Sequence, residues 1–195
     1  MKADLVHNIE NFVFQKRDIF LVKETLAGKK DSFARLMALY QKRVEALGMS
    51  FFHNREDTED FVQDVFLKAY SKLDTFRGES RFSTWLTRIA YTTAINTKSR
   101  RKETNSLLDE DILISEMDSP EQTELRRVTE QAVQEAVKNL PENYRACMTL
   151  YFFLQTPYDE IAVITGLPVN TIKSHIFRAK KILREKLRDY KYNHL

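Results

Sequence analysis

Carboxylates repeat along one predicted helix, and side chains of this kind can hold a divalent metal or act as an acid–base pair. Asp57, Asp60 and Asp64 are three and four residues apart, which places them on one helical face. No His or Cys lies within a turn of Asp60, and the pattern matches neither a zinc helix nor a calcium loop. We interpret this stripe as a solvated face or as a surface that docks on another protein, and we expect no metal site.

Patterns of other catalytic sites are not found in the sequence. The 195 residues contain neither a glycine loop of the kind that holds phosphates nor a nucleophile beside a base, and the four histidines are scattered. We therefore expect a protein that is not an enzyme and that carries no cofactor.

The segment YDEIAVITGLPVNTIKSHIFRA, residues 158–179, has the pattern of a helix-turn-helix. Small Ala162 lets two helices approach closely, and Gly166 permits the tight turn between them. Thr156 is expected to cap the first helix with its hydroxyl, and Pro168 is expected to open the second. Six residues of the second helix are expected to offer donors to the base edges and phosphates of duplex DNA: Asn170, Thr171, Lys173, Ser174, His175 and Arg178.

The charge of this final helix favours DNA binding. Residues 173–191 contain eight Lys or Arg and only two acidic residues. Such a face attracts phosphate groups. An ordinary helical hairpin with a solvated basic face is the alternative.

Aromatic and basic residues alternate in a second segment, residues 76–91, and a basic run follows at residues 98–102. Cationic side chains can follow the phosphates of a single strand while aromatic rings stack on unpaired bases, at about 1–3 kcal/mol per stacked base. Phe82 and Trp85 could equally be core residues. This signal therefore gains weight only beside a second DNA-binding domain on the same chain.

Helices must position all of these side chains. Gly and Pro number four each, and apolar residues recur every three or four positions, so the sequence predicts an all-α protein. Asp31 and Asn54 are expected to cap two helices of the first half, and Gly28 is expected to end the helix before them. We expect a loop over residues 77–82 and a helix over residues 83–101.

The distribution of charge indicates two domains. No Lys or Arg occurs between Glu103 and Leu125, where acidic residues, Ser and Pro accumulate. We interpret this stretch as a flexible acidic linker between two small helical domains. The expected divisions are an N-terminal extension of unknown role over residues 1–20, a first domain over 21–102, the linker over 103–122 and a second domain over 123–192.

Composition also bears on the compartment. The single cysteine, Cys147, cannot form an internal disulfide and lies among apolar residues, as is typical of a reduced intracellular protein. No stretch approaches the ~20 apolar residues of a membrane span, so we expect a cytoplasmic protein without membrane insertion. The net charge of +3 is too small to identify a partner.

These segments resemble the extracytoplasmic-function sigma factors, a subfamily of the sigma-70-type factors of bacterial RNA polymerase. NREDTEDFVQDVFLKAYSKLDTFRG, from residue 54, is similar to the core-binding helix of that family, and FSTWLTRIAYTTAINTKSRR, from residue 82, to its promoter-melting helix. LPENYRACMTLYFF, followed by the helix-turn-helix, resembles its minus-35-binding domain. The resemblance covers about residues 22–102 and 128–190, and it implies that the two domains are sigma region 2 and sigma region 4.

The resemblance implies a role for each surface. The chain would bind core RNA polymerase, recognise the minus-35 and minus-10 elements of promoter DNA, and promote promoter melting. The implied contacts with the beta-prime clamp helices of polymerase are Asp60, Gln63, Asp64 and Leu67. The implied minus-10 contacts are Arg77, Arg81, Phe82, Trp85, Arg88, Thr92, Asn96, Arg100 and Arg101. Region 4 would bind the beta flap, and its minus-35 contacts would be the six helix residues named above.

The chain departs from the family at two of these positions. Family members commonly carry Asn where this chain has Thr92, and Arg is usual where it has His175. The promoter sequence is therefore not carried over. The family also implies a separate anti-sigma factor as a partner, because its members are usually held inactive by such a protein.

Two other classes compete with this interpretation. A stand-alone helix-turn-helix regulator would use the first domain to sense a signal or to dimerise. A nucleic-acid enzyme would use the acidic stripe to bind a metal. Binding to core polymerase separates the first from a sigma factor, and metal-dependent cleavage of DNA would reveal the second.

Overall fold

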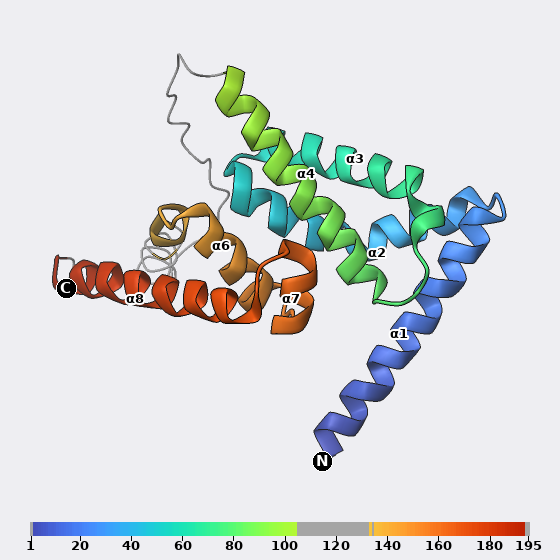
Figure 1. Ribbon diagram of the computed structural model, residues 1–195, viewed down its shortest axis with the longest axis horizontal. Coiled ribbons are helices and arrows are strands. Elements are labelled where there is room, and N and C mark those ends of the chain that lie inside the picture. Colours follow the sequence, from blue (N-terminus) through green and yellow to red (C-terminus); the bar gives the residue numbers. More distant parts are fainter. Residues whose placement is uncertain (1, 105–132, 134, 194–195) are drawn as a thin grey trace, which may run out of the picture.

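The computed structural model describes residues 2–104, residue 133 and residues 135–193, and this part of the chain contains helices and turns but no strand. The all-α prediction is confirmed. The α-helices, which Figure 1 labels, are α1 (Lys2–Leu26), α2 (Lys30–Phe52), α3 (Arg55–Ser71), α4 (Phe82–Thr104), α6 (Glu142–Met148), α7 (Tyr158–Thr165) and α8 (Val169–Asn193). Two short elements join them: the 3-10 turn η1 (Leu73–Thr75) after α3 and the π-turn η2 (Thr149–Phe153) after α6. The expected linker over residues 103–122 lies outside the described residues except for its first two positions.

Helices α2, α3 and α4 pack against one another to form the first bundle, and α1 packs along α2 (Figure 1). Buried Asp18 anchors α1, because its carboxylate accepts a hydrogen bond from the Tyr40 hydroxyl of α2 and lies 2.8 Å from Arg17 Nη2. The helix runs without interruption through residue 20, where we expected the N-terminal extension to end. Its N-terminal end projects away from the bundle (Figure 1).

Helices α2 and α3 approach closely at Gly48. A Cβ atom at this position would lie 2.7 Å from Cδ1 of Phe61 and 3.0 Å from Cγ2 of Thr58. A methyl group at these distances would force the packed side chains of Phe61 and Thr58 to move. Glycine at this position therefore sets the separation of α2 from the helix that carries the acidic stripe.

Several helix boundaries confirm the sequence signals. The side chain of Asn54 caps α3, since its Oδ1 accepts a hydrogen bond from the Asp57 backbone nitrogen at 2.8 Å. Gly166 ends α7 with a left-handed backbone, φ +74, a conformation that glycine adopts without strain. Gly28, which follows α1, likewise has φ +94.

Two capping predictions are wrong. Asp31 lies inside the first turn of α2, while Lys29 occupies the cap position without a side-chain hydrogen bond. Pro157, not Thr156, occupies the cap position of α7. The Thr156 hydroxyl instead donates to the Leu154 carbonyl oxygen at 3.3 Å and accepts a hydrogen bond from Arg43 of α2 at 2.8 Å. A partner 113 residues away in the chain has thus displaced the local cap.

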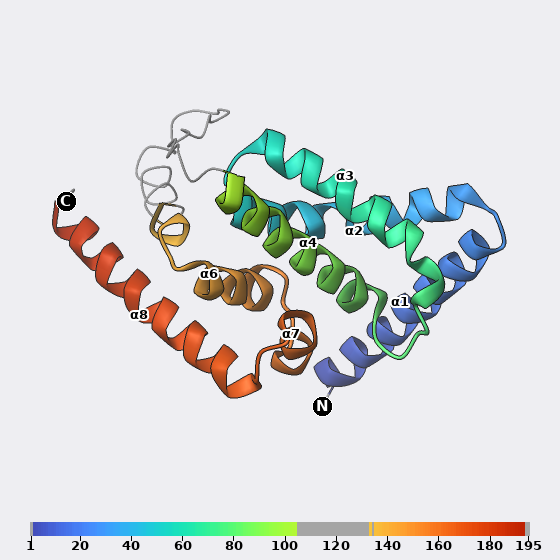
Figure 2. The ribbon, with the colours of Figure 1, turned by 45° about the horizontal axis from the view of Figure 1, so that its top comes forward.

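The second bundle is formed by α6, η2, α7 and α8, and its buried residues include Leu150, Ile161, Ile172 and Ile176. It lies directly against the first bundle, because α7 packs on α4 while α6 and η2 pack on α2. Figures 1 and 2 both show the two bundles side by side. No helix in the described part of the chain combines the length and the apolar character that crossing a membrane would require.

Candidate nucleic-acid interface and docking face

The acidic stripe of α3 divides into two parts. Asp57 is engaged within the protein, because both of its carboxylate oxygens lie 2.6 Å from the guanidinium of Arg101. This ion pair is the main cause that lowers the pKa of Asp57, with a further contribution from the Asn54 side chain. Asp60 and Gln63 further along the helix are exposed to solvent.

Leu67 belongs to the same exposed face, and 71% of its surface is accessible. Asp64 is half buried, and its Oδ2 lies 2.6 Å from Lys68 Nζ. Asp60, Gln63, Asp64 and Leu67 form what we call the docking face, a surface with carboxylates around an exposed apolar residue. Tyr70, which our sequence analysis missed, is 48% exposed three residues after Leu67, and that spacing could have indicated it.

The docking face does not resemble a metal site. No group of three or more His, Cys, Asp or Glu side chains in the described residues is arranged to hold a metal ion. Leu67 and Tyr70 instead place two exposed apolar side chains beside these carboxylates, and the combination offers apolar area and negative charge to a partner protein.

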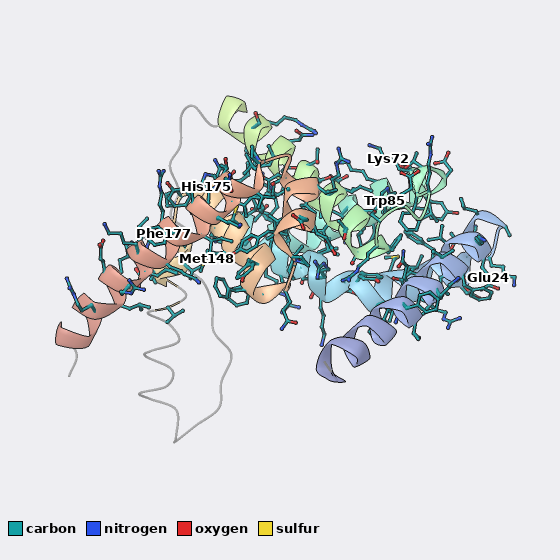
Figure 3. All side chains as sticks on the ribbon, turned by 60° about the horizontal axis from the view of Figure 1, so that its bottom comes forward. Glu24, Lys72, Trp85, Met148, His175 and Phe177 are labelled. Atoms are coloured by element: carbon teal, nitrogen blue, oxygen red, sulfur yellow. The ribbon has the colours of Figure 1, made fainter. Side chains whose placement is uncertain are left out.

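The loop before α4 is supported by an aromatic cluster. The rings of Phe76, Phe82 and Trp85 lie 5.4–5.5 Å apart, and Tyr40 packs 5.3 Å from Phe82. Phe82 is only 1% exposed, so this residue, which we had placed among the minus-10 contacts, belongs to the core in this structure. Trp85 is partly accessible on α4 (Figure 3).

A polar stripe follows along the outer side of α4. Arg88, Thr92 and Asn96 are exposed at intervals of four residues, and Arg100 continues the stripe as an exposed residue. The Thr92 hydroxyl donates to the Arg88 carbonyl oxygen at 2.9 Å, which leaves its oxygen as an acceptor for an outside donor. Arg77, in the loop before α4, is also exposed. Together these residues form a surface of cations and hydrogen-bonding groups that suits a nucleic-acid strand.

Arg101 and Arg81 are each paired with a carboxylate of the protein. Arg101 binds Asp57 and also lies over the ring of Phe52, 5.5 Å from its centroid. Arg81 lies at the junction of the two bundles, where its Nε is 3.7 Å from Oε1 of Glu160 on α7. Contact of either residue with DNA requires that these ion pairs be exchanged for phosphate.

Helix α8 presents the predicted second surface. Asn170, Lys173, Ser174 and Arg178 are exposed, and Thr171 is half buried. Phe177, which our sequence analysis did not include, is 70% exposed beside them (Figure 3). An apolar ring on this face can contact thymine methyl groups. The signal that could have revealed it is its position three residues after Ser174, on the polar side of the helix.

His175 lies differently from its neighbours on α8. Its ring is half buried, 5.0 Å from the ring of Tyr144, and its Nδ1 is 3.8 Å from Cys147 Sγ. Burial, assisted by the nearby charge of Arg178, lowers the pKa of His175, so the ring is neutral at neutral pH. An uncharged, inward-packed ring is a weaker phosphate ligand than an arginine side chain.

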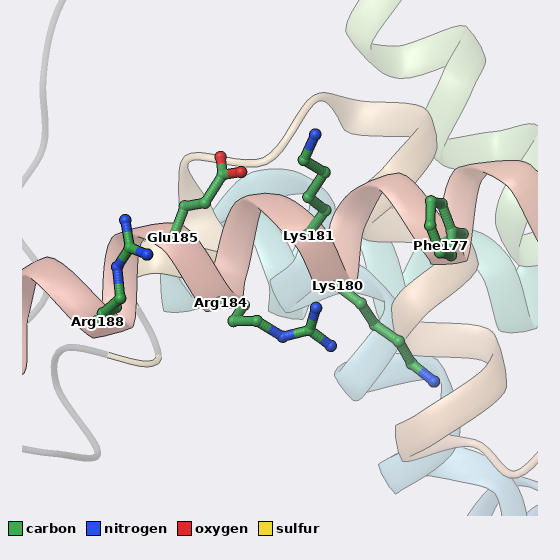
Figure 4. A pocket seen from close by; sticks show the side chains of 6 residues that line it. All are labelled: Phe177, Lys180, Lys181, Arg184, Glu185 and Arg188. Atoms are coloured by element: carbon green, nitrogen blue, oxygen red, sulfur yellow. The ribbon is translucent and has the colours of Figure 1, made fainter.

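After Arg178, the exposed side of α8 carries further basic residues. Figure 4 shows the side chains of Lys180, Lys181, Arg184 and Arg188 lining a shallow hollow with Phe177 and Glu185. A charge distribution of this kind attracts the phosphate backbone whatever the base sequence.

Comparisons with known proteins agree with this geometry. Residues 36–104 match the family model of Sigma-70 region 2, and residues 130–183 match that of Sigma-70, region 4. RNA polymerase sigma-H factor of Pseudomonas aeruginosa is 35% identical over 183 residues, covering 89% of this chain and 95% of that protein. The ECF RNA polymerase sigma-E factor of Haemophilus influenzae is 36% identical with 89% and 96% coverage, and that of Escherichia coli (strain K12) is 35% identical with 89% and 95% coverage.

Solved structures show the same fold. The sigma factor RpoE of Bartonella quintana, in complex with the anti-sigma factor NepR, superposes with a TM-score of 0.67 at 25% identity, over 80% of this chain and 96% of that one. CnrH in complex with the cytosolic domain of CnrY also gives a TM-score of 0.67, at 22% identity, over 89% and 98%.

The fold and the comparisons define a sigma factor, a transcription-initiation subunit of RNA polymerase. More particularly, the chain belongs to the extracytoplasmic-function sigma factors. It binds core polymerase, recognises the minus-35 and minus-10 promoter elements and promotes promoter melting.

Proposed function

We propose that the docking face of α3 binds the beta-prime clamp helices of core polymerase. The observation that supports this role is an exposed leucine amid carboxylates on the outer side of region 2. The apolar side chain would supply buried area, and Asp60 and Asp64 would supply charge complementarity to a basic partner. Region 4 would bind the beta flap. Because polymerase works in the cytoplasm, we place this chain there.

The polar stripe of α4 is proposed to bind the minus-10 element as a single strand. Arg77, Arg88 and Arg100 would contact phosphates, while Thr92 and Asn96 would contact the bases. Trp85 would stack on an unpaired base, which offsets part of the few kcal/mol that unstacking costs. Arg81 and Arg101 would join this surface once released from their carboxylate partners, and buried Phe82 would support the loop from within.

Helix α8 is proposed to read the minus-35 element in the major groove. Asn170, Lys173, Ser174 and Arg178 would make the polar contacts, and Phe177 would make an apolar one. Thr171 and His175, which are half buried, would contribute at the margin of this surface. The proposed domains are region 2 over residues 21–102 and region 4 over residues 123–192, with the linker over 103–122.

A separate anti-sigma factor is proposed as a regulator. The Bartonella quintana relative was solved in complex with the anti-sigma factor NepR, and its fold covers most of this chain. A protein of that kind would compete with core polymerase for region 2 and region 4. Co-purification of a protein that blocks transcription by this chain would identify it.

Run-off transcription with purified core polymerase tests the proposal. The wild-type chain should start RNA synthesis at specific sites of a genomic promoter library, and core alone should not. Asp60→Arg should abolish both core binding and transcripts. Glu59→Arg is the matched control, since it makes the same charge change at an exposed position of α3 outside the docking face. If Asp60→Arg binds core polymerase as tightly as Glu59→Arg does, the docking face has been assigned to the wrong residues.

The minus-10 surface needs its own test. Arg88→Ala and Trp85→Ala should reduce the permanganate reactivity of promoter thymines while leaving core binding intact. Lys30→Ala, which removes an exposed charge at the start of α2, is the control. Normal promoter opening by both α4 variants would show that this stripe does not contact the melted strand.

A further inference from the structure

The first half of α1 has no part in the functions proposed so far. It precedes both matched family segments, the first of which begins at residue 36. Its N-terminal end projects away from the first bundle (Figure 1), whereas the second half of the helix is anchored on α2 through Asp18. Phe14, one turn before Asp18, is 49% exposed. The ring of Phe14 is therefore available to a ligand.

A cation lies beside this exposed ring. The guanidinium carbon of Arg17 is 5.1 Å from the centroid of the Phe14 ring. Buried Asp18 orients the guanidinium, because its Oδ1 accepts hydrogen bonds from Arg17 Nε at 3.0 Å and from Nη2 at 2.8 Å. The third nitrogen, Nη1, can donate to an anion from outside. A ring that stacks and a cation that binds phosphate are the two elements of a single-strand binding surface.

The side chains of this pair line a hollow between three helices. They share it with Gln15, Asp18, Leu39, Tyr40, Arg81 and Ser83. Leu39 adds an apolar side chain that is 46% exposed, and Arg81 adds a second cation. The charge of Asp18 is satisfied within the protein, because its second oxygen accepts a hydrogen bond from the Tyr40 hydroxyl. The hollow therefore offers apolar surface together with hydrogen-bond donors, as a nucleotide requires.

The hollow adjoins the loop of the proposed minus-10 surface. Arg81, one of the proposed minus-10 contacts, also lines the hollow. The loop rests on α1 at Gly78, where a Cβ atom would lie 3.7 Å from Cδ1 of Ile19. The ring of Tyr40 packs 5.3 Å from that of Phe82 in the aromatic cluster. A strand that leaves the α4 stripe at this loop therefore meets the hollow next.

The arrangement of the apolar residues on α1 favours such a ligand over a partner helix or a membrane surface. Phe12, Val13 and Phe14 are all exposed and are consecutive in the sequence. Successive residues of an α-helix point about 100° apart, so these side chains lie on different sides of α1. A partner helix or a lipid surface requires instead an apolar stripe along one side. Of the three residues only Phe14 lines the hollow, as suits a ligand that stacks on a single ring.

We propose that the hollow holds an unpaired nucleotide of the non-template strand, just past the minus-10 element toward the start site. Phe14 stacks on its base, Leu39 supplies apolar contact and Arg17 binds its phosphate. The site rests on the function proposed for the α4 stripe, because that stripe delivers the strand to the loop. Since every base has a face that can stack, this site tolerates any sequence and serves to hold the promoter open.

Forked promoter DNA tests the site in the complex of the full chain with core polymerase. The promoter sequence comes from the run-off library. One probe ends its non-template single strand at the last base of the minus-10 element, and the other continues as a run of thymidines. The wild-type complex should bind the extended probe about five- to tenfold more tightly, measured by fluorescence anisotropy. Phe14→Ala should lose this gain and bind the short probe normally, while Phe14→Tyr, which keeps a ring, should retain it.

Phe12→Ala is the matched control, since it removes an exposed ring of α1 that does not line the hollow, and it should keep the gain. Arg17→Gln provides a second variant, because the glutamine amide can still donate to Asp18. It should lower the salt slope of extended-probe binding by about 0.7, the value for one phosphate of a single strand. Lys23→Gln, at another exposed position of α1, should leave that slope unchanged.

Photocrosslinking identifies the occupant of the hollow. Iodouracil placed just past the minus-10 element should crosslink to the α1 peptide that contains Phe14. Crosslinks to core polymerase alone, or equal losses of Phe14→Ala on both probes, would overturn the site. If the short probe binds and the extension adds nothing, this site fails while the α4 stripe stands. If neither probe is bound, the function proposed for α4 fails and the site fails with it.

Discussion

His53 makes the stability of the folded chain depend on pH in a way that can be calculated. The residue ends α2 with a left-handed backbone, φ 61, and lies half buried at the seam between the two bundles. Burial is the main cause that lowers its pKa from 6.5 to about 4, and the charges of Arg145, Lys98 and Lys138 act in the same direction. The imidazole is therefore neutral in the folded protein at neutral pH.

The direction in which stability changes with pH follows from the pKa of His53 in the unfolded chain and in the folded protein. The unfolded chain takes up a proton at His53 near pH 6.5, whereas the folded protein resists protonation until about pH 4. The neutral ring contributes its full stability above pH 6.5, and this contribution is lost as the pH falls toward 4. One pKa unit is worth about 1.4 kcal/mol, so the free energy of unfolding can lose at most about 3 kcal/mol through His53. Partial exposure of the ring reduces the expected loss to about 1–2 kcal/mol.

Urea unfolding at several pH values between 7.5 and 4.5 measures this loss. His53→Asn is the matched variant, because Asn tolerates the left-handed backbone and does not titrate. The wild-type free energy of unfolding should fall by about 1–2 kcal/mol more than that of His53→Asn over this range. The carboxylates titrate in both proteins and cancel in the comparison. Parallel pH profiles would refute the assignment of the lowered pKa to His53.

Three further predictions follow from the geometry. Gly48→Ala should destabilise the protein by about 1–2 kcal/mol in urea unfolding, because overpacking against Phe61 exceeds the gain in helix propensity. Cys147, which is 1% exposed and whose thiol pKa burial raises to about 11, should react with iodoacetamide only after unfolding; rapid labelling of the native protein would contradict its placement. Lys173→Ala should lower the salt slope of minus-35 duplex binding by about one, measured by fluorescence anisotropy, while Lys30→Ala leaves the slope unchanged.

The sequence was sufficient for features that depend on neighbours in the chain. The Asn54 cap, the Gly166 turn and the apolar face of each helix follow from residues within one or two turns, where spacing and side-chain chemistry decide the conformation. The exposed positions on α3 and α8 follow in the same way, because residues three or four positions apart in a helix lie on the same side of it. Both domains could thus be predicted before their packing was known.

Features that depend on distant residues could not be read from the sequence. The Thr156 hydroxyl has the spacing of a helix cap, yet Arg43 binds it from 113 positions away. Arg101 looks like a free phosphate ligand until Asp57, 44 positions away, is found beside it. Phe82 could be a stacking platform or a core residue, and only its burial decides between the two. Each of these outcomes is set by tertiary packing that a single sequence does not encode locally.

The three hydrogen-bond acceptors of Arg43 are uncharged, and this determines how these contacts respond to ionic strength. Hydroxyl and carbonyl oxygens carry no net charge, so dissolved ions have little to screen at this junction, whereas the grip of α8 on phosphates weakens steeply as ions accumulate. Osmotic upshift, which concentrates potassium inside a cell, would therefore loosen the hold of α8 on DNA far more than the three hydrogen bonds of Arg43. The contacts of Arg43 would thus persist at ionic strengths that release α8 from the chromosome.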